Sequence, residues 1–149
     1  MVIDGVEVRS VPAADADVLA LAAAQQAELA ALYGEDQPLV ALHDEIRFIV
    51  LTLDGIATGC VGLQPVAPGV GEIKRMYVVP AARGRGLSRV LLDAVEAAAR
   101  ADGLTRLRLE TGTKQVEAIA LYTHHGYEPI PAYPPFEHEP ASVCFAKDL

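Results

Sequence analysis

Two glycines alternate with arginines in the segment Arg83-Gly84-Arg85-Gly86, directly ahead of a helical apolar pattern that begins at Leu87. The first amides of a helix lack intrahelical partners and lie at the positive end of the helix dipole. Glycines let such amides converge and keep side chains away from a bulky anion, and arginines add charge-assisted contacts. The segment therefore predicts a phosphate or diphosphate site. Its expected members are Arg83, Gly84, Arg85, Gly86, Leu87, Ser88 and Arg89.

Two common nucleotide-binding motifs do not match this segment. A P-loop requires GxxxxGK[ST], and that spacing is absent. A dinucleotide fingerprint requires a third glycine where Arg89 stands, and it belongs near the first strand rather than in the middle of the chain. The segment alone leaves one alternative open, a strand-to-helix turn whose arginines only face solvent.

The elements expected around this segment alternate between strands and helices. Their order, β α β β β α β α β β, predicts an α/β (α+β) fold in which one mixed sheet carries helices on both faces, in a single domain over 1–149. Residues 35–45 are expected to form a loop or a short helical turn. Strands are expected over 2–11, 46–55, 56–66, 71–79, 104–111, 127–131 and 142–149, and helices over 13–34, 87–101 and 115–126.

Composition excludes several classes of function. Hydrophobic residues make up 52% and charged residues 21% of the 149 residues, which is typical of a globular protein rather than a disordered one. The net charge of −8 argues against nucleic acid as a partner. No apolar run is long enough for a membrane span and the first residues lack a signal-peptide pattern, so we expect a cytoplasmic protein. Cys60 and Cys144 are expected to be buried, reduced thiols, and no His/Cys spacing predicts a metal site.

Two stretches together resemble the GNAT superfamily of acyl-CoA N-acyltransferases, over roughly residues 46 to 131. Arg83-x-x-Gly86-x-Ser88 is similar to that family's acyl-CoA motif, in which glycine or alanine usually stands where this chain has serine. The run "EAIALYTHHGYEPI" is similar to a later signature of the family, Ala-x-x-x-Tyr-x-x-x-Gly-aromatic. The residues that supply this signature are Ala118, Tyr122, Gly126 and Tyr127.

The resemblance implies where acetyl-CoA binds and what reaction follows. The sheet would splay between its fourth and fifth strands, and the pantetheine arm would enter the gap along Met76, Tyr77 and Val78. The diphosphate would lie on the amides from Arg83 to Arg89. An acetyl group would then pass by direct attack to a primary amine of a small molecule or a protein, with general acid-base assistance.

Tyr122 and Glu72 are the candidate catalytic residues that the resemblance indicates. The phenol of Tyr122 would protonate the leaving thiolate, and the alternative is an aromatic residue packed in the core. The carboxylate of Glu72 would accept the proton of the amine, and the alternative is an exposed strand-end glutamate paired with Lys74 or Arg75. Other candidates are Glu110, which could simply face solvent, and the pair His124 and His125, which is expected at the end of a helix.

The acceptor is expected to contact Lys74 and Arg75, which could bind a carboxylate, and Tyr133 in the proline-rich loop "PAYPPFEHEP". The same loop could instead hold its aromatic residues on the core. Two other functions remain open at this point: a non-catalytic module that binds or senses acyl-CoA, and a binder of another phosphoester. A homodimer is compatible with the apolar last strand, which could equally be internal.

Overall fold

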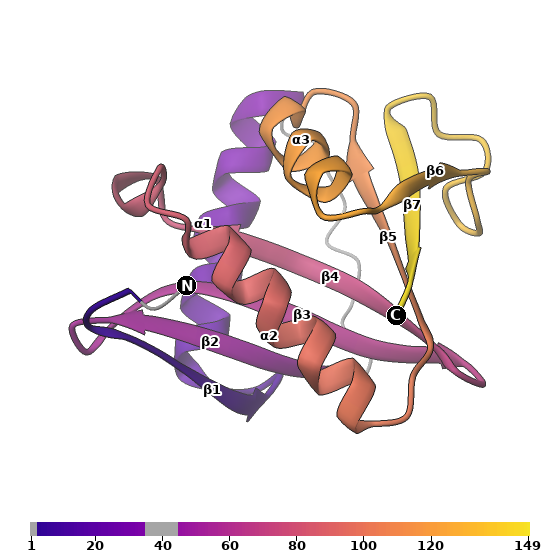
Figure 1. The fold of residues 1–149 in the computed structure, drawn as a ribbon. Helices are drawn as coiled ribbons and strands as arrows, with labels where there is room; N and C mark the ends of the chain where they lie inside the picture. Colours follow the sequence, from indigo (N-terminus) through magenta and orange to yellow (C-terminus); the bar gives the residue numbers. More distant parts are fainter. Residues whose placement is uncertain (1–2, 35–44) are drawn as a thin grey trace.

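The computed structural model describes residues 3–34 and 45–149. They form one seven-stranded sheet in the order β1-β2-β3-β4-β5-β7-β6 (Figure 1). The sequence of elements is the predicted one, and the loop expected over 35–45 lies almost wholly outside the described residues. The strands are β1 Val6–Pro12, β2 Arg47–Leu53, β3 Ile56–Ala67, β4 Val70–Val78, β5 Arg106–Gly112, β6 Glu128–Ile130 and β7 Ser142–Asp148. The helices are α1 Ala16–Tyr33, α2 Leu87–Ala101 and α3 Val116–His124.

Local sequence signals explain where the two long helices begin and end. The Asp15 side chain accepts hydrogen bonds from the amides of Asp17 and Val18, which caps α1. Gly34, with a φ of 99°, follows the last residue of α1. Helix α2 covers the predicted range 87–101 because its apolar residues recur at helical spacing.

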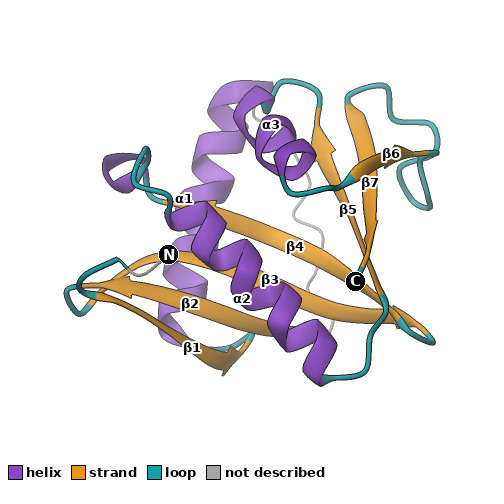
Figure 2. Ribbon diagram, in the orientation of Figure 1, coloured by secondary structure: helices purple, strands orange, loops and turns teal. Residues whose placement is uncertain are grey.

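The helices cover both faces of the sheet (Figure 2). On one face, Val18 and Leu21 of α1 belong to a buried cluster with Phe48 and Val50 of β2. On the other face, buried residues of α2 and α3, such as Leu91 of α2, pack against alternate residues of β2 to β5. No helix within the described residues is both long and apolar enough to cross a membrane.

The sheet opens between β4 and β5, as predicted for the fourth and fifth strands. The two strands pair in parallel only from Val70 to Ile73 on β4, opposite Arg106 to Leu109 on β5. Beyond Ile73 each strand continues without pairing to the other. A bulge accompanies this separation, because Arg75 has a φ of 53° and the β3–β4 register shifts between Cys60 and Gly62.

The two cysteines are buried inside the fold, and the last strand lies inside the sheet. Cys60 on β3 and Cys144 on β7 are both buried and free, as predicted. Strand β7 lies between β5 and β6, so the apolar last strand is internal to the sheet and does not form one of its edges. The exposed edges belong to β1 and β6.

Candidate active site

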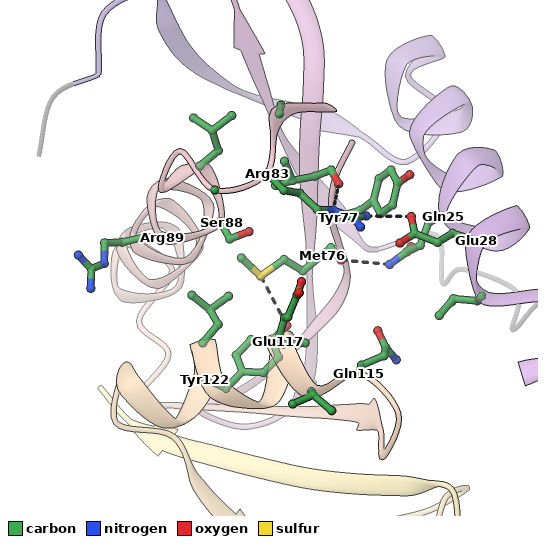
Figure 3. Close-up of a pocket in the computed structure, with 18 of the residues that line it drawn as sticks. Gln25, Glu28, Met76, Tyr77, Arg83, Ser88, Arg89, Gln115, Glu117 and Tyr122 are labelled. Carbon is green, nitrogen blue, oxygen red and sulfur yellow. Dashed lines mark hydrogen bonds and ion pairs between the residues drawn. The ribbon is translucent and has the colours of Figure 1, made fainter. Parts of the chain in front are cut away.

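A groove of about 620 Å³ opens between the start of α2 and helix α3, on the side where β4 and β5 separate (Figure 3). Gly86 precedes α2 in the left-handed conformation with a φ of 78°, which glycine adopts without a steric penalty. The first intrahelical bond joins the Val90 amide to the Gly86 carbonyl at 3.3 Å. The amides of Leu87, Ser88 and Arg89 therefore precede that bond, and these residues line the groove.

The three arginines of the glycine segment differ in their relation to the groove: Arg83 and Arg89 line it, and Arg85 does not. The Arg83 Nε donates to the Val78 carbonyl at 2.9 Å, and its Nη2 lies 2.8 Å from Glu28 of α1. This ion pair lowers the pKa of Glu28. The guanidinium that was expected to contact an anion is thus engaged within the protein. Arg85 is exposed and outside the residues that line the groove, whereas Arg89 lines it and extends away from Met76 (Figure 3).

Strand β4 presents part of its backbone to the gap. The Met76 carbonyl accepts a hydrogen bond from Gln25 Nε2 at 3.0 Å, and the Val78 carbonyl accepts the one from Arg83. The Val79 amide donates in the opposite direction, to the Thr58 carbonyl near the start of β3. Because backbone groups alternate along a strand, the amides and carbonyls of Met76 and Val78 face the gap and those of Tyr77 face β3.

A second cavity, of about 490 Å³, meets the groove at this gap. The two share six lining residues, which come from α1, β4 and the region of α3. These are Gln25, Leu29, Met76, Gln115, Ala118 and Tyr122. A molecule in the second cavity would therefore meet a molecule in the groove where these shared residues lie.

Tyr122 lies at that junction. Its hydroxyl donates to the Met76 sulfur at 3.5 Å, and its side chain is buried. Burial raises the pKa of the phenol above its ordinary value of 10.0. Tyr122 consequently stays protonated at neutral pH and can donate a proton or a hydrogen bond.

Glu72 lines the second cavity but is held by two cations. Its Oε1 lies 3.1 Å from Arg108 Nε, and its Oε2 lies 3.3 Å from Lys74 Nζ. The side chain is buried, so the pairing with Lys74 that the alternative interpretation expected is present, but the exposure that it expected is not. The guanidinium of Arg108 also stacks 3.9 Å above the ring centroid of Tyr133.

Glu110 lines the same cavity and has a neutral hydroxyl, rather than a cation, as its hydrogen-bond partner. It follows Arg108 by two residues, past the end of the β4–β5 pairing, and accepts a hydrogen bond from Ser142 Oγ at 3.3 Å. Burial raises its pKa above the ordinary value, with the hydroxyl of Ser142 acting against the rise and the charge of Glu72 adding to it. The alternation of "LTRLRLET" places Glu110 on the same face of the strand as Arg108. This alternation is the only sign in the sequence that Glu110 lies near the pair formed by Arg108 and Glu72.

Three other predicted residues lie away from the junction. Tyr133 is buried beneath Arg108 and does not line either cavity in the described part of the chain, whereas Pro135 and Phe136 of the same loop line the second one. His124 and His125 mark the end of α3, as expected, and line neither cavity. Within residues 3–34 and 45–149, no group of three His, Cys, Asp or Glu side chains could hold a metal ion.

The model of the acetyltransferase (GNAT) family matches residues 17–127, about three quarters of the chain. The chain belongs to the GNAT family. It is 41% identical over 106 residues to an IAA acetyltransferase from Azospirillum brasilense, covering 70% of this chain and 69% of that protein. A crystal structure from Klebsiella pneumoniae, assigned as an acyl-CoA N-acyltransferase, is 36% identical with a TM-score of 0.84 and covers 97% of both chains.

More distant relatives share the GNAT fold. A structure from Elizabethkingia anophelis with acetyl-CoA bound superposes with a TM-score of 0.75 at 17% identity, and covers 99% of this chain and all of that one. The GNAT protein described here is an acyl-CoA-dependent N-acetyltransferase, and acetyl-CoA is its acyl donor. The glycine start of α2 and the unpaired edge of β4 are chemically suited to a diphosphate and an amide-containing arm.

Sequence reasoning did not find the residues that surround the predicted ones. Gln25 and Glu28 come from α1, more than fifty positions before the backbone and side chain that they contact. Arg108 reaches Glu72 because β5 pairs with β4. These contacts join residues far apart in the sequence, so no local pattern predicts them.

Proposed function

We propose that the protein transfers the acetyl group of acetyl-CoA to the primary amine of a small molecule that occupies the second cavity. The observation that carries this proposal is that the groove and the second cavity meet at Tyr122 and Met76. A cavity of about 490 Å³ suits a small acceptor better than a protein surface. The amine nitrogen attacks the thioester carbonyl, the new C–N bond forms, and the C–S bond breaks.

The donor lies along the groove. Its diphosphate accepts hydrogen bonds from the amides between Gly86 and Arg89, at the positive end of α2. Its pantetheine arm follows the edge of β4 at Met76 and Val78, where the side chains of Gln25 and Arg83 now hold the carbonyls. The Val78 amide, which faces the gap, is the proposed donor to the oxygen of the tetrahedral intermediate.

Tyr122 is the proposed general acid. Its proton passes to the sulfur of CoA as the C–S bond breaks, so that the leaving group departs as a thiol. The buried, protonated phenol supports this role, as does its position between the two cavities.

Glu110 takes the role of general base in this proposal, in place of Glu72. Both carboxylates line the second cavity, but Glu72 is engaged by Arg108 and Lys74 while Glu110 accepts a hydrogen bond from a neutral hydroxyl. A carboxylate with a raised pKa is the better proton acceptor. Glu72 then orients Lys74 at the wall of the cavity and holds Arg108 behind that wall.

The acceptor proposed here carries a carboxylate as well as its amine. Lys74 and Arg75 line the cavity and supply positive charge for that carboxylate. Tyr33 and Phe136 supply apolar walls for the rest of the molecule. An amino acid with an apolar side chain meets all three requirements.

An acceptor screen that follows thiol release from acetyl-CoA tests this function. We expect turnover with apolar amino acids and little with their decarboxylated amines. Preference for amines that lack a carboxylate would contradict the acceptor class. Calorimetric titration with CoA and ATP is the companion measurement, because tighter binding of ATP would indicate a phosphoester binder.

We also propose that the protein acts in the cytoplasm and without nucleic acid. Two buried, free thiols suit a reducing compartment, and the net charge of −8 opposes contact with phosphate backbones. A homodimer stays a prediction. Because β7 is internal, its interface would use an edge strand or a helix, and light scattering in solution would detect it.

A further inference from the structure

A second tyrosine packs against the ring of Tyr122. Tyr127, just after the end of α3, packs its ring against Tyr122 with centroids 5.7 Å apart and planes inclined by 65°. This edge-to-face arrangement is a favoured geometry for aromatic pairs. Tyr127 is only 2% exposed, so its ring has little room to move.

The hydroxyl of Tyr127 is anchored to an ion pair whose carboxylate is buried and whose lysine is half-buried. It donates to Glu96 Oε2 of α2 at 2.9 Å. Lys147 of β7 places its Nζ 2.9 Å from Oε1 and 3.2 Å from Oε2 of the same carboxylate. Burial and the charge of Glu96 raise the pKa of Tyr127, which keeps this phenol a donor.

The cost of burying this carboxylate suggests that the ion pair contributes more than stability. Glu96 is 4% exposed, and removing a carboxylate from water is expensive even when it is paired. The three side chains join α2, β7 and the segment after α3 next to the ring of Tyr127, which contacts Tyr122. Arg100 of α2 makes a longer contact of 3.9 Å with the same carboxylate. Neither Glu96 nor Lys147 lines the groove or the second cavity among the described residues.

We propose that Glu96, Lys147 and Tyr127 are positioning residues, which fix the ring of Tyr122 so that its hydroxyl faces the junction of the two cavities. The inference rests on the proposed role of Tyr122 as the general acid. The three residues act only through Tyr122 and do not touch the substrates.

Ring-flip rates of Tyr122, measured by NMR on protein with ¹³C-labelled tyrosine, test the inference without using activity. We expect Tyr127→Phe, which keeps the ring but loses the anchor, to speed the flipping at least about tenfold. Glu96→Gln should act in the same direction, and Lys147→Arg should restore most of the restraint that Lys147→Met removes. Val50→Ala, which opens a cavity on the other face of the sheet, is the control for lost stability. Flip rates that are equal in all variants, or already fast in the unaltered protein, would overturn the inference.

Kinetics in two backgrounds separate positioning from general damage. We expect Tyr127→Phe to lower kcat about fivefold with both KM values nearly unchanged, and to have no further effect when Tyr122→Phe is already present. An equal loss in both backgrounds would show a merely structural role. If Tyr122→Phe alone leaves kcat intact, the acid role fails, whereas the ring-flip result still decides whether the cluster restrains Tyr122.

Discussion

At the scale of single residues, Glu72 and Glu110 show how neighbours decide what a carboxylate does. Both line the second cavity. Glu72 forms ion pairs with Arg108 and Lys74, which leave both of its oxygens occupied. Glu110 has the hydroxyl of Ser142 as hydrogen-bond donor and is partly desolvated, so its pKa rises. The two residues consequently suit different roles.

Glu110→Gln should lower kcat at least about tenfold, because the amide cannot accept the proton of the amine. In the unaltered protein, kcat should fall as the pH drops through the raised pKa of Glu110, that is, above the ordinary glutamate value of 4.5. The acidic limb should vanish in the variant. Steady-state rates across the pH range measure both effects. Glu72→Gln is the matched comparison: it should mainly raise the KM of the acceptor, and an equal loss of kcat there would return the base role to Glu72.

Tyr122→Phe should lower kcat by about ten- to a hundredfold and leave the Kd of acetyl-CoA within about twofold, because only the proton donor is lost. Thiol release and calorimetry supply the two numbers. The phenol has a raised pKa, so the unaltered protein should show no alkaline loss of rate near pH 10, the ordinary tyrosine value. A variant with normal kcat would contradict the acid role.

At the scale of elements, the start of α2 determines where the donor diphosphate binds. Gly86→Val should raise the Kd of CoA at least about tenfold, or roughly 1.4 kcal/mol, because a branched side chain would stand where the anion approaches. Backbone strain is a second effect, and Gly103→Val separates it. Gly103 follows the other end of α2 with a φ of 79° and open space around it. The Gly103 variant should lose stability similarly but bind CoA normally, and equal affinities in the two variants would argue against this location.

The end of α1 reaches β5 through a close contact. A Cβ added at Gly112 would overlap the hydroxyl of Tyr33. The oxygen of this hydroxyl accepts a hydrogen bond from the Lys114 amide at 3.1 Å. Gly112→Ala should therefore displace the Tyr33 side chain from the wall of the second cavity and raise the acceptor KM about threefold or more, with the Kd of CoA unchanged. In a Tyr33→Ala background the added methyl should have no such effect. Loss of CoA affinity instead of acceptor affinity would contradict this division of the site.

Several elements follow from local patterns and several contacts do not. The bounds of α2, the glycine at its start and the position of Tyr122 on α3 were predicted, because helical spacing, capping and the later signature are local in sequence. The side chain of Arg83 was predicted to contact an anion, and the structure places it on Glu28, fifty-five positions away. Tyr133 was predicted in the acceptor site and lies instead under Arg108.

At the scale of the whole molecule, two arginines attach α1 to the rest of the fold through ion pairs, and one of them, Arg9, also pairs with Asp17 in the first turn of α1. Arg9 of β1 contacts Asp15 at the start of α1 at 3.2 Å, and Arg83 contacts Glu28 farther along the helix. The partner arginines lower the pKa values of Asp15 and Glu28 from ordinary values of 3.8 and 4.5. Because the folded pKa values lie below the unfolded ones, these pairs contribute their full stability above pH 4.5 and lose it as the pH falls through the lowered values.

Thermal unfolding followed by circular dichroism should therefore show a Tm that decreases by several degrees on acidification below pH 4.5. The variant Asp15→Asn/Glu28→Gln should start from a lower Tm at neutral pH and show a shallower decrease, because its two contacts no longer titrate. The same slope in both proteins would mean that other carboxylates control the acid unfolding.

The sequence by itself determined the order of elements, the family, the donor and the location of the glycine start of α2, because these depend on periodicity, backbone conformation and short motifs. Only the tertiary structure decided which carboxylate is held by ion pairs, which residue Arg83 contacts, and which residue packs against Tyr122. Those outcomes depend on contacts between α1, α2, β4, β5 and β7, whose partners are brought together by strand pairing and packing across long stretches of chain.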